Sequence, residues 1–380
     1  MIDTQLGYKD HIRLRNISSR LEQHRASGLL GDGVSVFTSN VTGGRVQREI
    51  AEHLRIHQIT GGVPARFSGA VVNRRDPIGP LRSCHLTSFS KSFEIGDDEH
   101  GFGNCMLIRS GWSDLLSRTW NAGRFRCLRL SESMGWKDDS VEFLETFPKN
   151  YPDSIEIYSE RITNITPLRR FDGLKKIGLA TKDAEGFESS QFPHLEVLTY
   201  SWTKSGHLDV FPDSLKTLMI DRYPKPNLND IPPAKNLENL LIGARRLKDL
   251  SGIEKFPNLK KLELLDVVAL DRIDELSCLK KLEDIVLFDA RKIKEIGVVS
   301  NFNLISLSLS GLPKLKSLSP LRSLETLKYL TIDGSTIVND GDLSPITSLS
   351  NLRDLVLVPR RRYHPAAREV QEVVNGRRRN

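Results

Sequence analysis

The chain has 380 residues, of which 38% are hydrophobic, 27% charged and 7% aromatic, and its formal net charge is +7 at pH 7. This composition is ordinary for a soluble protein, and no apolar run approaches the roughly 18 residues that a membrane-spanning helix needs. The first 16 residues carry five charged side chains and no apolar core segment, which argues against a secretory signal peptide. We therefore expect a cytoplasmic protein, with secretion that lacks a conventional signal left open.

Residues 1–78 form an N-terminal segment in which no repeat is visible. Helical spacing is present over residues 17–25 and 45–57, and a glycine-rich turn precedes a short predicted strand at 34–38. The segment is compatible with a small cap, a separate module or an unrecognised catalytic domain. An enzyme within residues 1–120 therefore stays an alternative.

The nearest approach to a metal site is the pair His53 and His57, four residues apart on a predicted helix beside Glu49 and Glu52. Two such histidines can share a metal ion, but the order is not HExxH and no third ligand follows. Phosphate-binding loops and nucleophile elbows are also absent from the sequence. We predict no catalytic residue, no metal and no cofactor.

The four cysteines, Cys84, Cys105, Cys127 and Cys278, show neither CxxC spacing nor the spacing of a metal site. We interpret them as reduced, buried, structural thiols. Three arginines flank Cys127 and could lower the pKa of its thiol, but no histidine accompanies it. No nucleophile is predicted from this pattern.

Residues 79–150 are predicted to be either degenerate first copies of a repeat or part of a cap. Three segments fit the spacing of the later copies, and end copies of a repeat are expected to be atypical because they close the core against water. These segments are Leu81/Cys84/Leu86, Phe102/Cys105/Leu107 and Phe125/Leu128/Leu130.

Residues 151–359 carry a repeat of one apolar phrase, in which the second and third apolar residues follow the first by three and five positions. Nine copies begin 20 to 25 positions apart, which is the signature of a solenoid. The copies are Leu174/Ile177/Leu179, Leu195/Leu198/Tyr200, Leu215/Leu218/Ile220, Leu237/Leu240/Ile242, Leu259/Leu262/Leu264, Leu282/Ile285/Leu287, Leu304/Leu307/Leu309, Leu327/Leu330/Ile332 and Leu352/Leu355/Leu357.

Each phrase predicts a short strand, because alternate residues of a strand point to the same side. Between strands, apolar residues recur at every third position, as at Leu247, Leu250, Ile253 and Phe256. This period fits short 3₁₀ turns, in which side chains three apart lie above one another. A parallel sheet along one edge and a stack of tight turns along the other are therefore expected.

The pattern resembles the leucine-rich repeat family, particularly its short, internalin-like class. The resemblance implies an α/β solenoid with a parallel sheet on the concave face, 3₁₀ or irregular turns on the convex face, and a small N-terminal cap or α+β segment. The family usually has asparagine three residues after the last strand leucine. Here those positions hold Lys182, Thr203, Tyr223, Arg245, Val267, Ala290, Leu312, Ser335 and Arg360, so the usual asparagine ladder is missing.

The outward positions of the strands are the main candidate site. Apolar and charged side chains fall there in adjacent copies, and an apolar centre with a charged rim is typical of protein interfaces. The alternative is that β-propensity alone places valine and leucine here. The predicted partner-binding residues are Trp202, Met219, Asp221, Leu241, Lys261, Glu263, Leu265, Asp284, Val286 and Phe288.

Residues 360–380 form a basic C-terminal tail with seven arginines and two glutamates, so the tail holds +5 of the net charge. This concentration leaves the rest of the chain with a net charge of only +2, which disfavours nucleic-acid binding by the repeats. We interpret the tail as a solvated terminus or a cap of the repeats, with a terminal helix at residues 365–375. Attraction of an acidic partner or nucleic acid by the tail is the alternative.

We expect a non-catalytic module that binds a protein partner on the concave face of the repeats. Proteins of this repeat class suggest two narrower alternatives, a bacterial toxin-immunity or regulatory protein and a secreted effector. The identity of the partner and the oligomeric state are left open.

Overall fold

The computed structural model describes residues 88–89, 92–97, 103–123, 125–149, 151–184, 186–204 and 206–377. They belong to two compact units, Met1–Ile162 and Thr163–Asn380. The predicted segment 1–78, with its histidine pair, and the phrase that contains Cys84 lie outside the described residues. The predicted start of the repeats at residue 151 falls inside the first unit.

The first unit contains five described strands in chain order. Strands β1 and β2 pair antiparallel, as do β2 and β3, whereas β3–β4 and β4–β5 are parallel. The elements are β1 (Ser88–Phe89), β2 (Phe93–Asp97), β3 (Asn104–Ile108), α3 (Asp114–Ala122), β4 (Cys127–Ser131), the 3₁₀ helices η1 (Glu132–Met134) and η2 (Glu142–Thr146), and β5 (Ser154–Ser159).

The phrase predicted at residues 102–107 is one position out of register. Met106 and Ile108 pair with Leu128 and Leu130 and are fully buried with them. Cys105 and Leu107 therefore lie on the opposite face of β3, because consecutive strand residues point to opposite sides. The phrase that ends in Leu128 and Leu130 has the predicted register.

Aromatic rings fill much of the core of the first unit. Helix α3 buries Leu116 and Trp120, and the Trp120 ring stacks against Phe147 and Phe125 at centroid distances of 4.8 and 5.7 Å. Trp136 is also buried. Large rings suit this position because a full α-helix stands farther from the sheet than a tight turn does.

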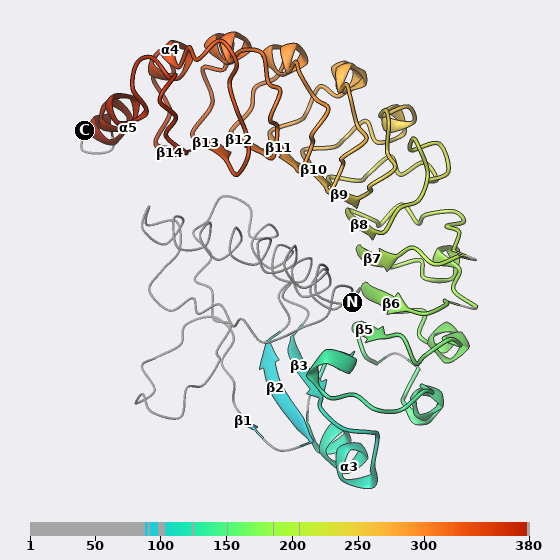
Figure 1. Cartoon of the computed structure of the whole chain (residues 1–380). Helices are drawn as coiled ribbons and strands as arrows, with labels where there is room; N and C mark the ends of the chain where they lie inside the picture. The colour runs from blue at the N-terminus through green and yellow to red at the C-terminus, as the bar shows by residue number, and fades with distance from the viewer. Residues whose placement is uncertain are drawn as a thin grey trace, which may run out of the picture. The chain divides into compact units, whose positions relative to one another are not determined.

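The second unit contains nine described strands, all parallel, in chain order. The strands are β6 (Lys176–Thr181), β7 (Val197–Ser201), β8 (Thr217–Asp221), β9 (Asn239–Gly243), β10 (Lys261–Leu265), β11 (Asp284–Phe288), β12 (Ser306–Ser310), β13 (Tyr329–Asp333) and β14 (Asp354–Leu357). Figure 1 shows them along the inner, concave side of this unit. The predicted parallel sheet is confirmed.

Short helices lie on the outer, convex side of the same unit (Figure 1). They are η3 (Thr166–Arg170), η4 (Ser189–Gln191), η5 (Ile253–Lys255), η6 (Asp274–Cys278), η7 (Gly297–Asn301), η8 (Ser319–Ser323) and α4 (Ser344–Thr347). The apolar residues spaced by three, such as Leu247, Leu250 and Ile253, are completely buried. The predicted 3₁₀ turns of the convex side are confirmed.

After five strands of the second unit, a turn with left-handed backbone occupies the side where the asparagine ladder is missing. Arg222, Asp266, Asp289, Gly311 and Gly334 each follow a strand and have positive φ angles, which turn the chain sharply. The next residue often enters the core, and backbone N–H groups bond to the neighbouring repeat, as from Tyr223 to the Gly243 carbonyl at 2.9 Å. In these turns, backbone hydrogen bonds connect neighbouring repeats without a side-chain amide.

A different polar ladder lies before the strands and was not predicted. The residue that precedes the first leucine of a phrase donates a hydrogen bond to a backbone carbonyl of the previous repeat. The bonds run from Ser214 to Pro193 and Leu195, from Asn236 to Asp213, from Asn258 to Lys235, from Thr326 to Leu304 and from Asn351 to Glu325, at 2.7 to 2.9 Å. These bonds satisfy carbonyls at the strand entrance.

The C-terminal tail closes the second unit with helix α5 (Ala367–Arg377). Val370 and Val374 are completely buried, and the Arg377 guanidinium donates to the carbonyls of Leu349 and Thr347 at 2.5 and 2.6 Å. Helix α5 therefore covers the last repeat, as the interpretation of the tail as a cap requires. No described helix is long and apolar enough to cross a bilayer.

Candidate functional site

The predicted partner-binding residues of β8–β11 lie on one face of the sheet, which we call the central patch. The strand register aligns them in three rows, since side chains two apart share a face. The first row contains Lys261 and Asp284, and the second contains Met219, Leu241, Glu263 and Val286. The third contains Asp221, Leu265 and Phe288, with Gly243 between Asp221 and Leu265. The repeat phrase thus predicted which residues are neighbours.

Solvent reaches only part of the central patch. Leu241, Val286 and Phe288 are partly exposed, whereas Met219 and Leu265 are buried, with 6% and 8% of their surface accessible. The first three side chains therefore form the apolar area that another molecule can touch directly. Sequence alone did not distinguish them from the two buried residues.

Lys261 lies between two carboxylates in the central patch. Its Nζ atom is 3.2 Å from Glu263 Oε1 and 3.5 Å from Asp284 Oδ2. Burial raises the pKa of Asp284 above its ordinary value, and the nearby Lys261 and a hydrogen bond from Ser306 offset part of this rise. Lys261 thus lies within ion-pair distance of carboxylates on its own strand and on the neighbouring strand.

Trp202 lies in the turn after β7 and is buried, with 9% of its surface accessible. Its ring contacts the buried Tyr223 and Tyr200 edge-on, at centroid distances of 5.1 and 6.0 Å. Its backbone N–H donates to the Asp221 carbonyl at 2.8 Å. These contacts tie the ends of neighbouring repeats together and support the edge of the patch at Asp221.

Strand β12, next to β11, carries small polar side chains on the same face of the sheet. On β12 the positions beside Asp284, Val286 and Phe288 are all serines, Ser306, Ser308 and Ser310. The contrast shows that strand propensity does not require large apolar residues at these positions. The row of apolar outward side chains thus stops at β11.

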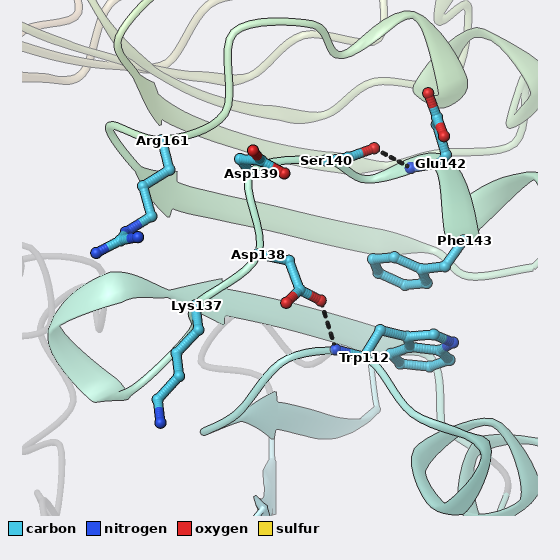
Figure 2. Close-up of a pocket in the computed structure, with 8 residues that line it drawn as sticks. All are labelled: Trp112, Lys137, Asp138, Asp139, Ser140, Glu142, Phe143 and Arg161. Atoms are coloured by element: carbon cyan, nitrogen blue, oxygen red, sulfur yellow. Dashed lines mark hydrogen bonds between the residues drawn. The ribbon is translucent and has the colours of Figure 1, made fainter.

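The first unit contains a pocket of about 450 Å³ in loops that follow β3, β4 and β5. Its lining combines two rings with charges of both signs, from Trp112, Lys137, Asp138, Asp139, Ser140, Glu142, Phe143 and Arg161. Figure 2 shows the Trp112 and Phe143 rings at one side of the pocket and Lys137 and Arg161 at the other. Sequence analysis missed this pocket, although the tryptophan and the charged run were visible.

Several of these side chains have structural roles. The rings of Trp112 and Phe143 stack on each other at 4.2 Å, and Asp138 accepts a hydrogen bond from the Trp112 backbone N–H at 2.7 Å. The Ser140 hydroxyl accepts a hydrogen bond from the Glu142 backbone N–H at 3.1 Å (Figure 2).

A metal centre is not visible in the part of the chain that the structure describes. No group of three or more histidine, cysteine, aspartate or glutamate side chains there could hold an ion. The histidine pair at residues 53 and 57 lies outside this part, so its interpretation is unchanged.

Comparisons with known proteins find similarity in solved structures. No family model matches the chain, and no curated protein matches it. An internalin from Listeria monocytogenes is 14% identical with a TM-score of 0.39, covering 66% of this chain and 79% of that one.

Two plant receptor structures are also similar. The peptide hormone receptor RGFR1, solved in complex with RGF2, is 12% identical with a TM-score of 0.35, over 69% of this chain and 51% of that one. The leucine-rich repeat ectodomain of a receptor kinase from Arabidopsis thaliana, solved with a bound factor, is 15% identical with a TM-score of 0.33, over 65% and 31%. With its own parallel strands and 3₁₀ turns, the chain has the architecture of a leucine-rich repeat solenoid.

Proposed function

We propose that this chain is a non-catalytic interaction module that binds one protein partner through the central patch. The supporting observation is the partly exposed group Leu241, Val286 and Phe288 beside the charged cluster of Lys261 and Asp284. An apolar centre with charges next to it is the usual anatomy of a protein interface. The parallel sheet holds these side chains on regular backbone, so little ordering is needed on binding.

Phe288 is the best candidate for the residue that contributes most to affinity. Aromatic side chains bury a large area, and a few central residues usually supply most of the binding free energy. Lys261 and Asp284 would contribute more to the choice of partner, since charge complementarity governs specificity more than affinity. A partner with a basic group beside an apolar side chain would match both features.

Affinity capture with the full-length chain tests this proposal. Phe288→Asp should weaken retention of a specific partner by at least about 30-fold, because it places a charge where apolar contact is expected. Thr331→Asp is the matched control, since it adds the same charge at a partly exposed position on the same face, two strands from β11. It should leave binding nearly unchanged.

Thermal unfolding of both variants shows whether loss of binding reflects loss of fold. Equal melting temperatures with selective loss in Phe288→Asp support the proposal. Equal binding by the wild-type chain and Phe288→Asp would remove the central patch as the binding surface. If the proposal holds, the identity of the captured partner would separate an immunity or regulatory role from an effector role.

A further inference from the structure

Two buried cysteines of the first unit lie side by side on neighbouring strands. Cys105 on β3 and Cys127 on β4 are direct partners in the parallel register, and their surfaces are 6% and 0% accessible. The Sγ atoms of the two residues lie 2.7 Å apart. Sequence analysis predicted independent, buried thiols, because 21 residues separate Cys105 from Cys127 and no CxxC spacing links them. Burial is confirmed for these two, whereas Cys278 is exposed.

The geometry of the two strands is suitable for a disulfide bond. Neighbouring strands lie about 4.8 Å apart, which is inside the range of about 4.4 to 6.8 Å between Cα atoms joined by disulfides. Both side chains leave the same face of the sheet because the two residues are in register. The sulfur atoms can therefore bond without a change of register or a large movement of the backbone.

We propose that Cys105 and Cys127 form a peroxide-sensitive pair that closes to a reversible disulfide and joins β3 to β4. The more accessible Cys105 thiolate attacks one oxygen of hydrogen peroxide, so an S–O bond forms, the O–O bond breaks and one water is released after proton transfer. The Cys127 sulfur then attacks the Cys105 sulfenic acid, forming the S–S bond and releasing a second water. Two thiols are oxidised and one peroxide is reduced.

Closure should affect the structure because the two cysteines enclose helix α3. A disulfide limits the conformations of the unfolded segment between its ends, which raises stability if the folded geometry accepts the bond. A thiol reductant such as glutathione would reverse the step by thiol–disulfide exchange. The pair is therefore a modification site that couples peroxide to the rigidity of the strands beside α3.

Peptide mapping of the full-length chain tests this proposal. Trypsin places the four cysteines on four different peptides, so each pairing gives a distinct linked product. The reduced chain is treated with hydrogen peroxide, free thiols are alkylated, and peptides are analysed without reduction. The expected result is a peptide pair that joins Cys105 to Cys127, disappears on reduction, and forms to the same extent in a Cys278→Ala control.

The outcomes separate the pair from other cysteine chemistry. Linkage of Cys84 to either residue, or recovery of Cys105 and Cys127 as separate alkylated or over-oxidised peptides, would overturn the proposal. Peptide mapping of the wild-type chain needs no variant, so misfolding of a variant cannot explain a negative result. Cys105→Ala should abolish the linked peptide and the rise in melting temperature, which we expect to be roughly 5–15 °C in the oxidised chain.

Discussion

The first unit and the regular repeats of the second unit fill the space behind their strands in different ways. The connection between β3 and β4 contains α3, a full α-helix of nine residues, whereas the repeats around β10 and β11 use 3₁₀ helices of three to five residues. Rings such as Trp120 gather in the core of the first unit, whereas leucine and isoleucine predominate, with single rings such as Phe256, in the core of the repeats. The same strand spacing thus tolerates different connections when the size of the core side chains changes.

This difference also affects how clearly each region can be recognised. Where connections are short and uniform, every core position recurs at nearly constant spacing. Where the connection is longer, as around α3, the aromatic residues are placed by contacts with one another. The regular spacing of apolar residues in the sequence is then lost. Three substitutions, two of them with a matched control, can break or sharpen this comparison.

The largest effect is expected from removing a ring in the first unit. Trp120→Ala deletes a side chain that is 1% accessible and stacked on Phe147 and Phe125. The free energy of unfolding should fall by about 3–5 kcal/mol, because the transfer energy is lost and a cavity remains. Denaturant unfolding followed by circular dichroism measures this change.

A control on the same helix is available. Leu115 is 59% accessible, so Leu115→Ala should change the free energy of unfolding by less than about 0.5 kcal/mol. Similar losses from both substitutions would show that α3 does not pack against a specific aromatic core.

An intermediate effect is expected at a tight turn of the second unit. Gly311 has a φ angle of +75°, and a Cβ atom there would lie 2.8 Å from the Asp289 Cα atom. Gly311→Ala should lower the free energy of unfolding by about 1–3 kcal/mol because the left-handed conformation and the close contact both disfavour a side chain. Thermal unfolding of the full-length chain measures it.

Gly297 supplies the matched substitution. It lies in η7, its φ angle is not in the left-handed region, and a Cβ atom there would meet nothing within 4 Å. Gly297→Ala should be neutral or slightly stabilising. Equal destabilisation by both changes would contradict the role given to the turns that follow the strands.

The smallest effect is expected from the polar ladder before the strands. Asn236→Ala removes one exposed hydrogen bond, of 2.9 Å, to the Asp213 carbonyl. The expected loss is about 0.5–1.5 kcal/mol, since a typical hydrogen bond contributes little net stability. Hydrogen exchange should rise mainly near the altered repeat, and uniform exchange across the whole chain would argue against a local role.

The repeat phrase predicted the strands of the second unit and the neighbours within the central patch. Leucines at fixed positions specify both the buried face and the outward face, since the side-chain period of a strand is two. The same reasoning was wrong by one residue in β3, where Cys105, Met106, Leu107 and Ile108 are all apolar. Without a polar residue to mark the outward side, sequence alone could not assign the faces.

Other features depend on contacts that no local pattern encodes. The accessibility of Phe288 and the burial of Leu265 differ although both are outward positions of adjacent strands. The approach of Cys105 and Cys127 requires the register of two strands, and the sequence gives no spacing rule for it. The left-handed turns on the side of the missing asparagine ladder became visible only through their φ angles.

Side-chain oxidation footprinting of the chain, alone and with its captured partner, tests the proposed binding surface most directly. Phe288 and Tyr329 are both partly exposed on the same face, two strands apart. We predict that the partner strongly protects Phe288 and leaves Tyr329 nearly unchanged. Protection of Tyr329 with unchanged labelling of Phe288 would contradict the central patch as the site of binding.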